Sequence, residues 1–284
     1  MVSLNCVCTD RQVRSGGLTI ICLLSYALLG AVAGLMAGLL GLGGGIIIVP
    51  ALSYLFAIQN LPIQHTVHLA VGTSLATIIF TAISSVRAHH LRGAVDWQVL
   101  KAITPGIIIG TGVGSYWASR LSTDYMKCLF AIFLIYVALQ MLLDLNSKPS
   151  VTIPGKVLTL SMGVIIGGVS SLVGIGGGSI SVPYLIWCNH PVRKAIGTSA
   201  AIGFPIALSG AIGYVFMGMR VQDLPSYSLG FVYLPALAGV ALASVLTAPY
   251  GARLAHRFPV GYLRKGFAVF LLIMAVKMIS GLYM

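Results

Sequence analysis

The sequence predicts an all-α, polytopic membrane protein built from two inverted repeats. Three observations lead to this prediction: a strongly apolar composition, long runs without charged residues, and a glycine-rich motif that occurs twice. Of the 284 residues, 58% are hydrophobic and 8% are charged, whereas soluble globular domains carry about 25% charged residues. A soluble domain of this size could not shield so much apolar surface from water, so the composition excludes an ordinary soluble enzyme.

The charged residues lie at the ends of apolar runs. Residues 15–86 contain no Asp, Glu, Lys or Arg, and shorter uncharged runs follow at 102–119, 128–143, 157–192, 195–219 and 224–252. A helix that spans a bilayer needs roughly 20 apolar residues. The formal net charge of +12 does not indicate nucleic-acid binding, because the basic residues flank apolar runs as they do in membrane proteins. We therefore expect the lipid bilayer, and no nucleic acid, as a partner.

The two halves of the chain match in sequence. Residues 41–50 (GLGGGIIIVP) align with residues 174–183 (GIGGGSISVP), and seven of the ten positions are identical. A Gly-Thr-Ser triplet follows in both halves, at residues 72–74 and 197–199, with a similar offset near 130. This conserved order indicates a duplication. The expected parts are an N-terminal tail at 1–17, a first transmembrane repeat at 18–145, a linker at 146–156 and a second transmembrane repeat at 157–284.

Each repeat holds five apolar segments, so that the chain has roughly 8–10 membrane segments. Those of the first repeat are 18–40, 46–58, 66–88, 98–120 and 124–145, and those of the second are 157–175, 179–188, 194–218, 228–253 and 260–282. The first is expected to be a retained helix and not a signal peptide, because its counterpart lies in the middle of the chain. Glycines spaced by four in the first and fourth segments predict close helix packing.

The second segment of each repeat is too short to span about 30 Å as a helix. Pro50 and Pro183 lie near its start, and proline is tolerated in a first helical turn but breaks a helix interior. We expect a helix, a glycine-rich break and then a half-helix, with the pair either broken or re-entrant. Either arrangement leaves an odd number of crossings in each repeat, so the second repeat is expected to be inverted.

The basic residues predict the orientation. Loops expected on one side hold most of them: Arg87, Arg92, Lys101, Lys148, Lys156, Arg193, Lys194, Arg253, Arg257, Arg264 and Lys265. Those expected on the other side are Arg11, Arg14, Arg120, Lys127 and Arg220. The positive-inside rule places the first set in the cytoplasm and both termini outside.

The glycine-rich breaks are the predicted binding site. Irregular backbone at membrane depth is tolerated only where protein buries it or where it lines a wet cavity. A helix N-terminus offers free N–H groups and partial positive charge, and paired interrupted segments in matching positions point to a transporter's substrate site. We predict that an anion binds at Gly43, Gly44, Gly45, Gly176, Gly177 and Gly178. The alternative is a tight contact between helices.

Hydroxyl side chains near the breaks are the next candidates. They are Thr73, Ser74, Thr198 and Ser199, which match across the repeats, and Ser179 in the second repeat alone. Hydroxyls can donate hydrogen bonds to sulfonate or carboxylate oxygens, and the alternative is a bond to a carbonyl one turn earlier. At the predicted cytoplasmic end of segment 66–88, a basic cluster is formed by Arg87, His89, His90 and Arg92.

The acidic residues exclude several chemistries. Every Asp lies at a segment end or in a loop, and the sequence contains no Glu. We find no Ser-His or Asp-Asp pair placed in the spans and no set of metal ligands, so we expect no catalytic residue, no metal site and no cofactor. Proton-coupled transporters commonly use buried Asp or Glu. Proton coupling would therefore require a His or the substrate itself, and facilitated diffusion is equally open.

The duplicated Gly-x-Gly-Gly-Gly…Pro stretch, followed each time by Gly-Thr-Ser, resembles the TauE/SafE family of membrane transporters. Residues 89–97 (HHLRGAVDW) also resemble that family's first cytoplasmic loop, which has no counterpart after Gly218. The resemblance covers residues 18–282. It implies a transporter of small sulfur-containing anions, such as sulfite, sulfoacetate or related organosulfonates, in the bacterial inner membrane, with the glycines and hydroxyls named above as site residues.

Inverted repeats permit alternating access, and this is the expected mechanism. The alternatives are a passive anion channel, a permease for another small organic anion, and a membrane scaffold without transport. The sequence does not choose the anion or the direction of transport, and it leaves open whether the chain forms a homo-oligomer.

Overall fold

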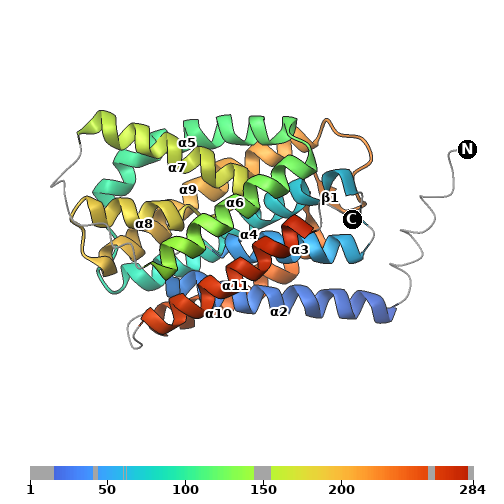
Figure 1. Ribbon diagram of the computed structural model, residues 1–284, viewed down its shortest axis with the longest axis horizontal. Coiled ribbons are helices and arrows are strands. Elements are labelled where there is room, and N and C mark those ends of the chain that lie inside the picture. The colour runs from blue at the N-terminus through green and yellow to red at the C-terminus, as the bar shows by residue number, and fades with distance from the viewer. Residues whose placement is uncertain are drawn as a thin grey trace, which may run out of the picture.

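The protein is a bundle of long helices that run along the longest axis of the molecule (Figure 1). The computed structural model describes residues 16–40, 44–59, 61, 63–143, 155–254 and 260–280. Gly43 and most of the predicted tail and linker lie outside these residues. The first-repeat helices are α2 (Gly16–Leu40), α3 (Gly45–Ile58), α4 (Thr66–His90), α5 (Trp97–Arg120) and α6 (Thr123–Leu142), with the 3-10 helix η1 (Ile63–His65) before α4. The second-repeat helices are α7 (Lys156–Val173), α8 (Gly178–Trp187), α9 (Val192–Gly218), α10 (Leu234–Leu254) and α11 (Val260–Ser280).

Each of the ten predicted segments overlaps one of these helices. Six of them, α2, α4, α6, α7, α9 and α10, are long and apolar enough to cross a membrane, which confirms the all-α polytopic prediction. One boundary is wrong, because residues 228–233 form a β-hairpin of β1 (Ser228–Leu229) and β2 (Val232–Tyr233) and the helix begins only at Leu234. Tyr227 and Gly230 have φ angles of 66° and 55°, a left-handed conformation that an α-helix cannot contain.

The predicted glycine spacing produces two closely packed helix pairs between the repeats. Gly30 and Gly34 of α2 lie against α10, where an added Cβ would come within 2.8 Å of the Val240 Cα and 2.6 Å of the Ser244 Cα, respectively. Gly106 of α5 faces Gly163 of α7 in the same way. Figure 1 shows α2 and α10 along one edge of the bundle and α5 and α7 along the opposite edge. The prediction that these glycines pack helices is confirmed.

The contacts between helices occur in reciprocal pairs. Helix α2 packs on α10, and their sequence counterparts α7 and α5 pack on each other. Helix α4 contacts α10 just as α9 contacts α5, and α3 contacts α4 just as α8 contacts α9. The equivalent helices α4 and α9 also pack together at the centre, as do α6 and α11. This exchange of roles is what a two-fold relation between similar units produces.

One end of the bundle carries basic residues. Asp96, after α4, and His190, after α8, lie together, with the Nδ1 of His190 4.0 Å from the Oδ2 of Asp96. We call this end the basic face and define it by residues 91–96 and 188–191. The exposed residues Arg92 and Arg193 lie at this end.

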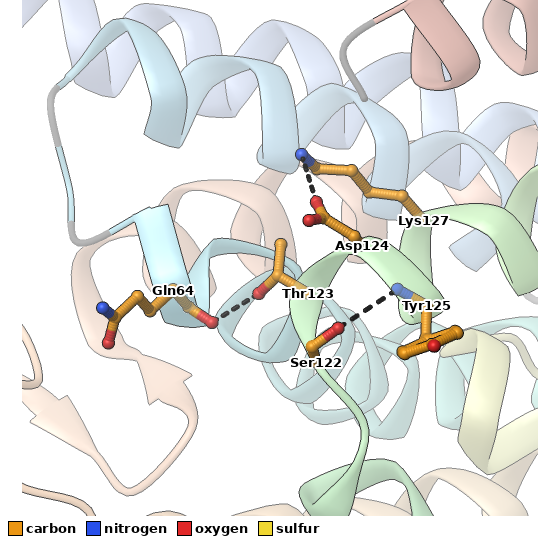
Figure 2. A network of polar contacts seen from close by, with 6 residues as sticks. All are labelled: Gln64, Ser122, Thr123, Asp124, Tyr125 and Lys127. Carbon is orange, nitrogen blue, oxygen red and sulfur yellow. Dashed lines mark hydrogen bonds and ion pairs between the residues drawn. The ribbon is translucent and has the colours of Figure 1, made fainter. Parts of the chain in front are cut away.

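The opposite end, the hairpin face, contains β1, β2, η1 and the start of α6. Figure 2 shows how η1 and α6 are joined there: the Thr123 hydroxyl donates to the backbone carbonyl of Gln64. The Ser122 hydroxyl accepts a hydrogen bond from the N–H of Tyr125 at 3.5 Å and so caps α6. Such an N-cap satisfies one of the backbone donors that a helix start leaves unpaired.

Each of the two short helices, α3 and α8, runs back toward the end of the bundle at which the preceding long helix, α2 or α7, begins. The Tyr26 hydroxyl of α2 donates to the Oε1 of Gln59, just after α3, at 2.8 Å, so α3 ends beside α2 near the hairpin face. Helix α8 ends near His190 at the basic face. In both repeats the short helix therefore runs back beside the helix that precedes the break, which is the arrangement expected of a re-entrant pair.

Candidate functional site

The two glycine-rich breaks meet in the middle of the bundle. A Cβ added at Gly45 would lie 2.9 Å from the Cα of Ile175 and 3.0 Å from the Cδ1 of Ile78, and Ile78 is the central residue of α4. The carbonyl oxygen of Gly176 lies 3.2 Å from the position of a Cβ on Gly203, near the middle of α9. The breaks therefore adjoin each other and the midpoints of the two central helices, as the sequence predicts.

The backbone repeats its conformation at both breaks. Gly44 precedes α3 with φ 76°, and Gly177 precedes α8 with φ 73°. Both angles are left-handed, a conformation that glycine adopts without the steric cost that a Cβ brings. The first N–H groups of each short helix have no partner within the helix. Two helix starts thus present backbone donors and partial positive charge in the interior of the bundle.

The two threonines of the Gly-Thr-Ser triplets make equivalent hydrogen bonds. The Thr73 hydroxyl oxygen accepts from the backbone N–H of Tyr233 at 2.9 Å, and that of Thr198 accepts from the N–H of Asp96 at 2.9 Å. Both threonines are buried. Because the oxygen is the acceptor in each bond, the hydroxyl hydrogen is left to donate elsewhere.

The serines of the triplets are tied to the second break. The Ser74 hydroxyl donates to the carbonyl of Gly174 at 2.8 Å. The Ser199 oxygen lies 2.7 Å from that of Ser181, which itself lies 2.9 Å from the Gly177 carbonyl. In this conformation the four predicted hydroxyls form hydrogen bonds within the protein. Contact between these hydroxyls and a substrate stays a prediction.

Three other buried serines have a hydroxyl without a hydrogen-bond partner among the described residues: Ser85, Ser170 and Ser179. Ser179 lies in the first turn of α8, as predicted. The sequence analysis missed Ser170, whose Oγ lies 3.2 Å from the position of a Cβ on Gly177. It also missed Ser85, although the four-residue spacing from Thr77 and Thr81 is visible in the sequence.

A small cavity lies between the repeats on the basic-face side of the breaks. Its lining comes from α2, α4, the second break and α9, namely Ala37, Ile78, Thr81, Ala82, Ser85, Gly176, Ala200 and Gly203. The space for the centre of a water molecule is about 10 Å³, close to what one water requires. A sulfite or sulfonate ion is larger, so the cavity must widen before such an ion can enter.

The corresponding region on the hairpin side of the breaks is filled by apolar side chains. The Cδ1 of Ile206 lies only 2.5 Å from the position of a Cβ on Gly177. The Cδ1 of Leu75 lies 3.0 Å from the corresponding position on Gly210. Apolar side chains therefore pack closely against the glycines on this side of the breaks.

The predicted basic cluster sits at the end of α4. Arg87, His89 and His90 belong to the last turn of the helix and only Arg92 lies beyond it. Arg87, His90 and Arg92 are exposed, whereas His89 is 1% exposed and so is part of the interior. The Trp97 Nε1 donates to the Nδ1 of His90 at 3.2 Å.

Comparison with known proteins agrees with this architecture. The sequence model of the family described as "Sulfite exporter TauE/SafE" matches residues 26–278. A "Probable membrane transporter protein" of Haemophilus influenzae is 38% identical over 253 residues, which are 88% of this chain and 96% of the relative. The "Probable membrane transporter protein MJ0441" of Methanocaldococcus jannaschii is 28% identical, over 90% of this chain and 93% of its own. No solved structure matches the chain significantly.

Proposed function

We propose, from the premise that this chain belongs to the sulfite exporter TauE/SafE family, that it carries small sulfur-containing anions across the membrane. The names of the family and of its relatives describe membrane transporters and not enzymes, and six long apolar helices fit a multi-pass protein. The observation that carries the proposal is the contact of the start of α3, at Gly45, with the second glycine-rich break, at Ile175, together with the left-handed glycine that precedes each short helix. Sulfite, sulfoacetate and related organosulfonates are the proposed substrates, and the bacterial relatives fit an inner-membrane location.

The proposed site binds an anion without a formal positive charge. Backbone N–H groups of Gly44, Gly45, Gly177 and Gly178 would face the anionic oxygens, because helix starts favour negative charge. Gly43 and Gly176 would allow close approach, and the Ser179 hydroxyl would add a donor. Thr73, Ser74, Thr198 and Ser199 hold the surrounding backbone and are proposed to contact the anion when the centre opens.

Transport is proposed to use alternating access between two inverted repeats. Helices α4 and α9 are equivalent in sequence and pack antiparallel: Leu75 lies against Gly210, while Ser85 lines the cavity with Ala200. Antiparallel packing of equivalent helices supports the inversion. Movement of one repeat against the other would widen the cavity on one side of the breaks and close the other side.

The basic face is proposed to be cytoplasmic, following the positive-inside rule. Its exposed arginines would raise the local concentration of anions at the entrance to the pathway. With the basic face in the cytoplasm, the orientation favours export of the anion. The same transporter would import the anion if the anion gradient across the membrane were reversed.

The test is counterflow in proteoliposomes. Vesicles are preloaded with unlabelled sulfite, and entry of labelled sulfite is followed against sulfonates, carboxylates and chloride as competitors. Saturable exchange that sulfonates inhibit is the expected result. Gly44→Leu and Gly177→Leu are expected to abolish exchange while the protein still elutes as a folded species, and normal exchange in both variants would overturn the site.

A passive anion channel is the second candidate, because it would use the same site. It differs in one measurable property: flux through a channel is linear in concentration and insensitive to preloading. A scaffold without transport gives no flux with any anion.

A further inference from the structure

One face of α4 is polar from Thr73 to the end of the helix. Its members follow one another every four residues: Thr73, Thr77, Thr81, Ser85 and His89. Residues at this spacing share one face of an α-helix. All five are at most 3% exposed, so the face points into the protein and not into lipid. We call these five residues the polar track.

The equivalent face of α9 does not repeat this pattern. Aligned through the Gly-Thr-Ser triplets, it reads Thr198, Ile202, Ile206, Gly210 and Tyr214. After the shared threonine it has no small hydroxyl. Because α4 and α9 run in opposite directions, the part of the track beyond Ile78, from Thr81 to His89, lies in the basic-face half of the interior, and Ile206, Gly210 and Tyr214 of α9 lie in the hairpin-face half.

Two of the threonine hydroxyls of the polar track have hydrogen-bond partners within the protein. The Thr77 hydroxyl donates to the Thr73 carbonyl at 2.8 Å. The Thr81 oxygen lies 2.7 Å from that of Ser244 on α10. Ser85 differs, because it lines the cavity together with Gly176 and its hydroxyl has no hydrogen-bond partner among the described residues. Buried hydroxyls are almost always paired, so an exception calls for a reason.

We propose that Ser85 binds the transported anion between the Gly176 break and the basic face, and that His89 continues this half of the pathway toward Arg87 and Arg92. The inference rests on the proposed function and adds a second binding position for the anion. The cavity beside Ser85 joins the track to the second break, and an imidazole offers an N–H donor in either protonation state. The anion thus exchanges backbone donors for a hydroxyl, then an imidazole, then exposed guanidinium groups.

The experiment places a cysteine at position 85 in a parent whose native cysteines are replaced by serine. Modification by 2-sulfonatoethyl methanethiosulfonate, itself a small sulfonate, is measured with the reagent on the basic face. Ser84→Cys is the matched control, because Ser84 donates to the Val245 carbonyl on α10 at 2.9 Å and points away from the cavity. We expect Ser85→Cys to react at least tenfold faster, and sulfoacetate or methanesulfonate, whichever the parent exchanges faster, to slow the reaction.

Equal reaction of the two variants, or reaction that the exchanged sulfonate does not slow, overturns the proposal. A second readout uses variants without cysteine chemistry. Ser85→Ala is expected to raise the half-saturation concentration for exchange about tenfold, the cost of one hydrogen bond to a charged group, and Ser85→Thr to restore it. Unchanged exchange in Ser85→Ala also contradicts the proposal. A parent without anion exchange contradicts the proposed function instead, and the two failures are therefore distinct.

Discussion

The Thr73 hydroxyl accepts a 2.9 Å hydrogen bond from the backbone N–H of Tyr233, and this bond has a counterpart in the other repeat. Thr198 accepts from the N–H of Asp96 at the same distance of 2.9 Å. Tyr233 immediately precedes α10 and Asp96 immediately precedes α5, so each bond fastens the triplet helix of one repeat to the start of a helix in the other. The threonine of each Gly-Thr-Ser triplet therefore links one repeat to the other through a hydrogen bond.

Replacing Thr73 by valine is expected to destabilise the fold. Valine keeps the shape but removes the acceptor, which leaves the partly buried Tyr233 N–H unpaired at a cost of about 1–3 kcal/mol. Thr73→Ser keeps the acceptor and is the control. Thermal unfolding in detergent measures the difference, and the Thr198 pair of variants should behave alike. Equal stability of Thr73→Val and Thr73→Ser would show that another group satisfies Tyr233.

Alanine in place of Gly72 or Gly197 is expected to destabilise the protein. A Cβ at Gly72 would collide with the carbonyl oxygen of Phe231, and one at Gly197 with that of Ala94. Such overpacking costs about 1–3 kcal/mol. Gly112→Ala is the matched control, because nothing lies within 4 Å of a Cβ there and alanine favours a helix by roughly 0.5–1 kcal/mol. Unfolding temperatures should fall for the first two variants and stay level or rise for the third, and a fall in all three contradicts this packing.

The sequence predicts much of this fold because membrane helices leave strong local signals. Uncharged runs of sufficient length, with glycines at intervals of four, determine the helices and the pairs that pack closely. The prolines and glycines around residues 41–50 and 174–183 mark the half-helices. The boundary at residue 234 was missed because the hairpin before it is mostly apolar, and its turn is marked in the sequence by a single glycine, Gly230, whose φ is 55°.

The candidate site was less predictable, because burial and pairing depend on neighbours distant in sequence. Thr73 and Thr198 looked like ligands for an anion, but their partners lie 160 and 102 residues away, respectively. His89 was expected in a basic cluster at the end of its helix, and its side chain is buried. Ser85 differs from Ser84 only in the direction in which it points, which one sequence without a structure does not specify.

Asp96 is expected to act mainly as the N-cap of α5. Its Oδ1 accepts from the N–H groups of Gln98 at 3.0 Å and Val99 at 3.2 Å. Asp96→Ala should cost about 1 kcal/mol of stability, whereas asparagine caps nearly as well as aspartate. Thermal unfolding of both variants provides the measurement. An equal loss in Asp96→Asn would instead assign the stabilisation to the charge that lies 4.0 Å from His190.

The inversion of the repeats makes a prediction about labelling from the two sides of the membrane. Gln64 precedes α4 at the hairpin face, and Arg193 lies at the start of the equivalent helix α9 at the basic face. Cysteines at these two positions, in the cysteine-free parent, should react with an impermeant maleimide from opposite sides, although they begin equivalent helices. Reaction from the same side would rule out the inversion.

The absolute orientation follows from the same experiment with one more position. Arg220 lies beyond the other end of α9, and both Arg193 and Arg220 are exposed. If the basic face is cytoplasmic, as the excess of arginine and lysine there predicts, Arg220→Cys reacts in intact cells and Arg193→Cys only after the membrane is permeabilised. The reverse pattern would place the basic face outside. The Ser85 half of the pathway would then open to the exterior, and the arginines around it would collect anions for uptake instead of export.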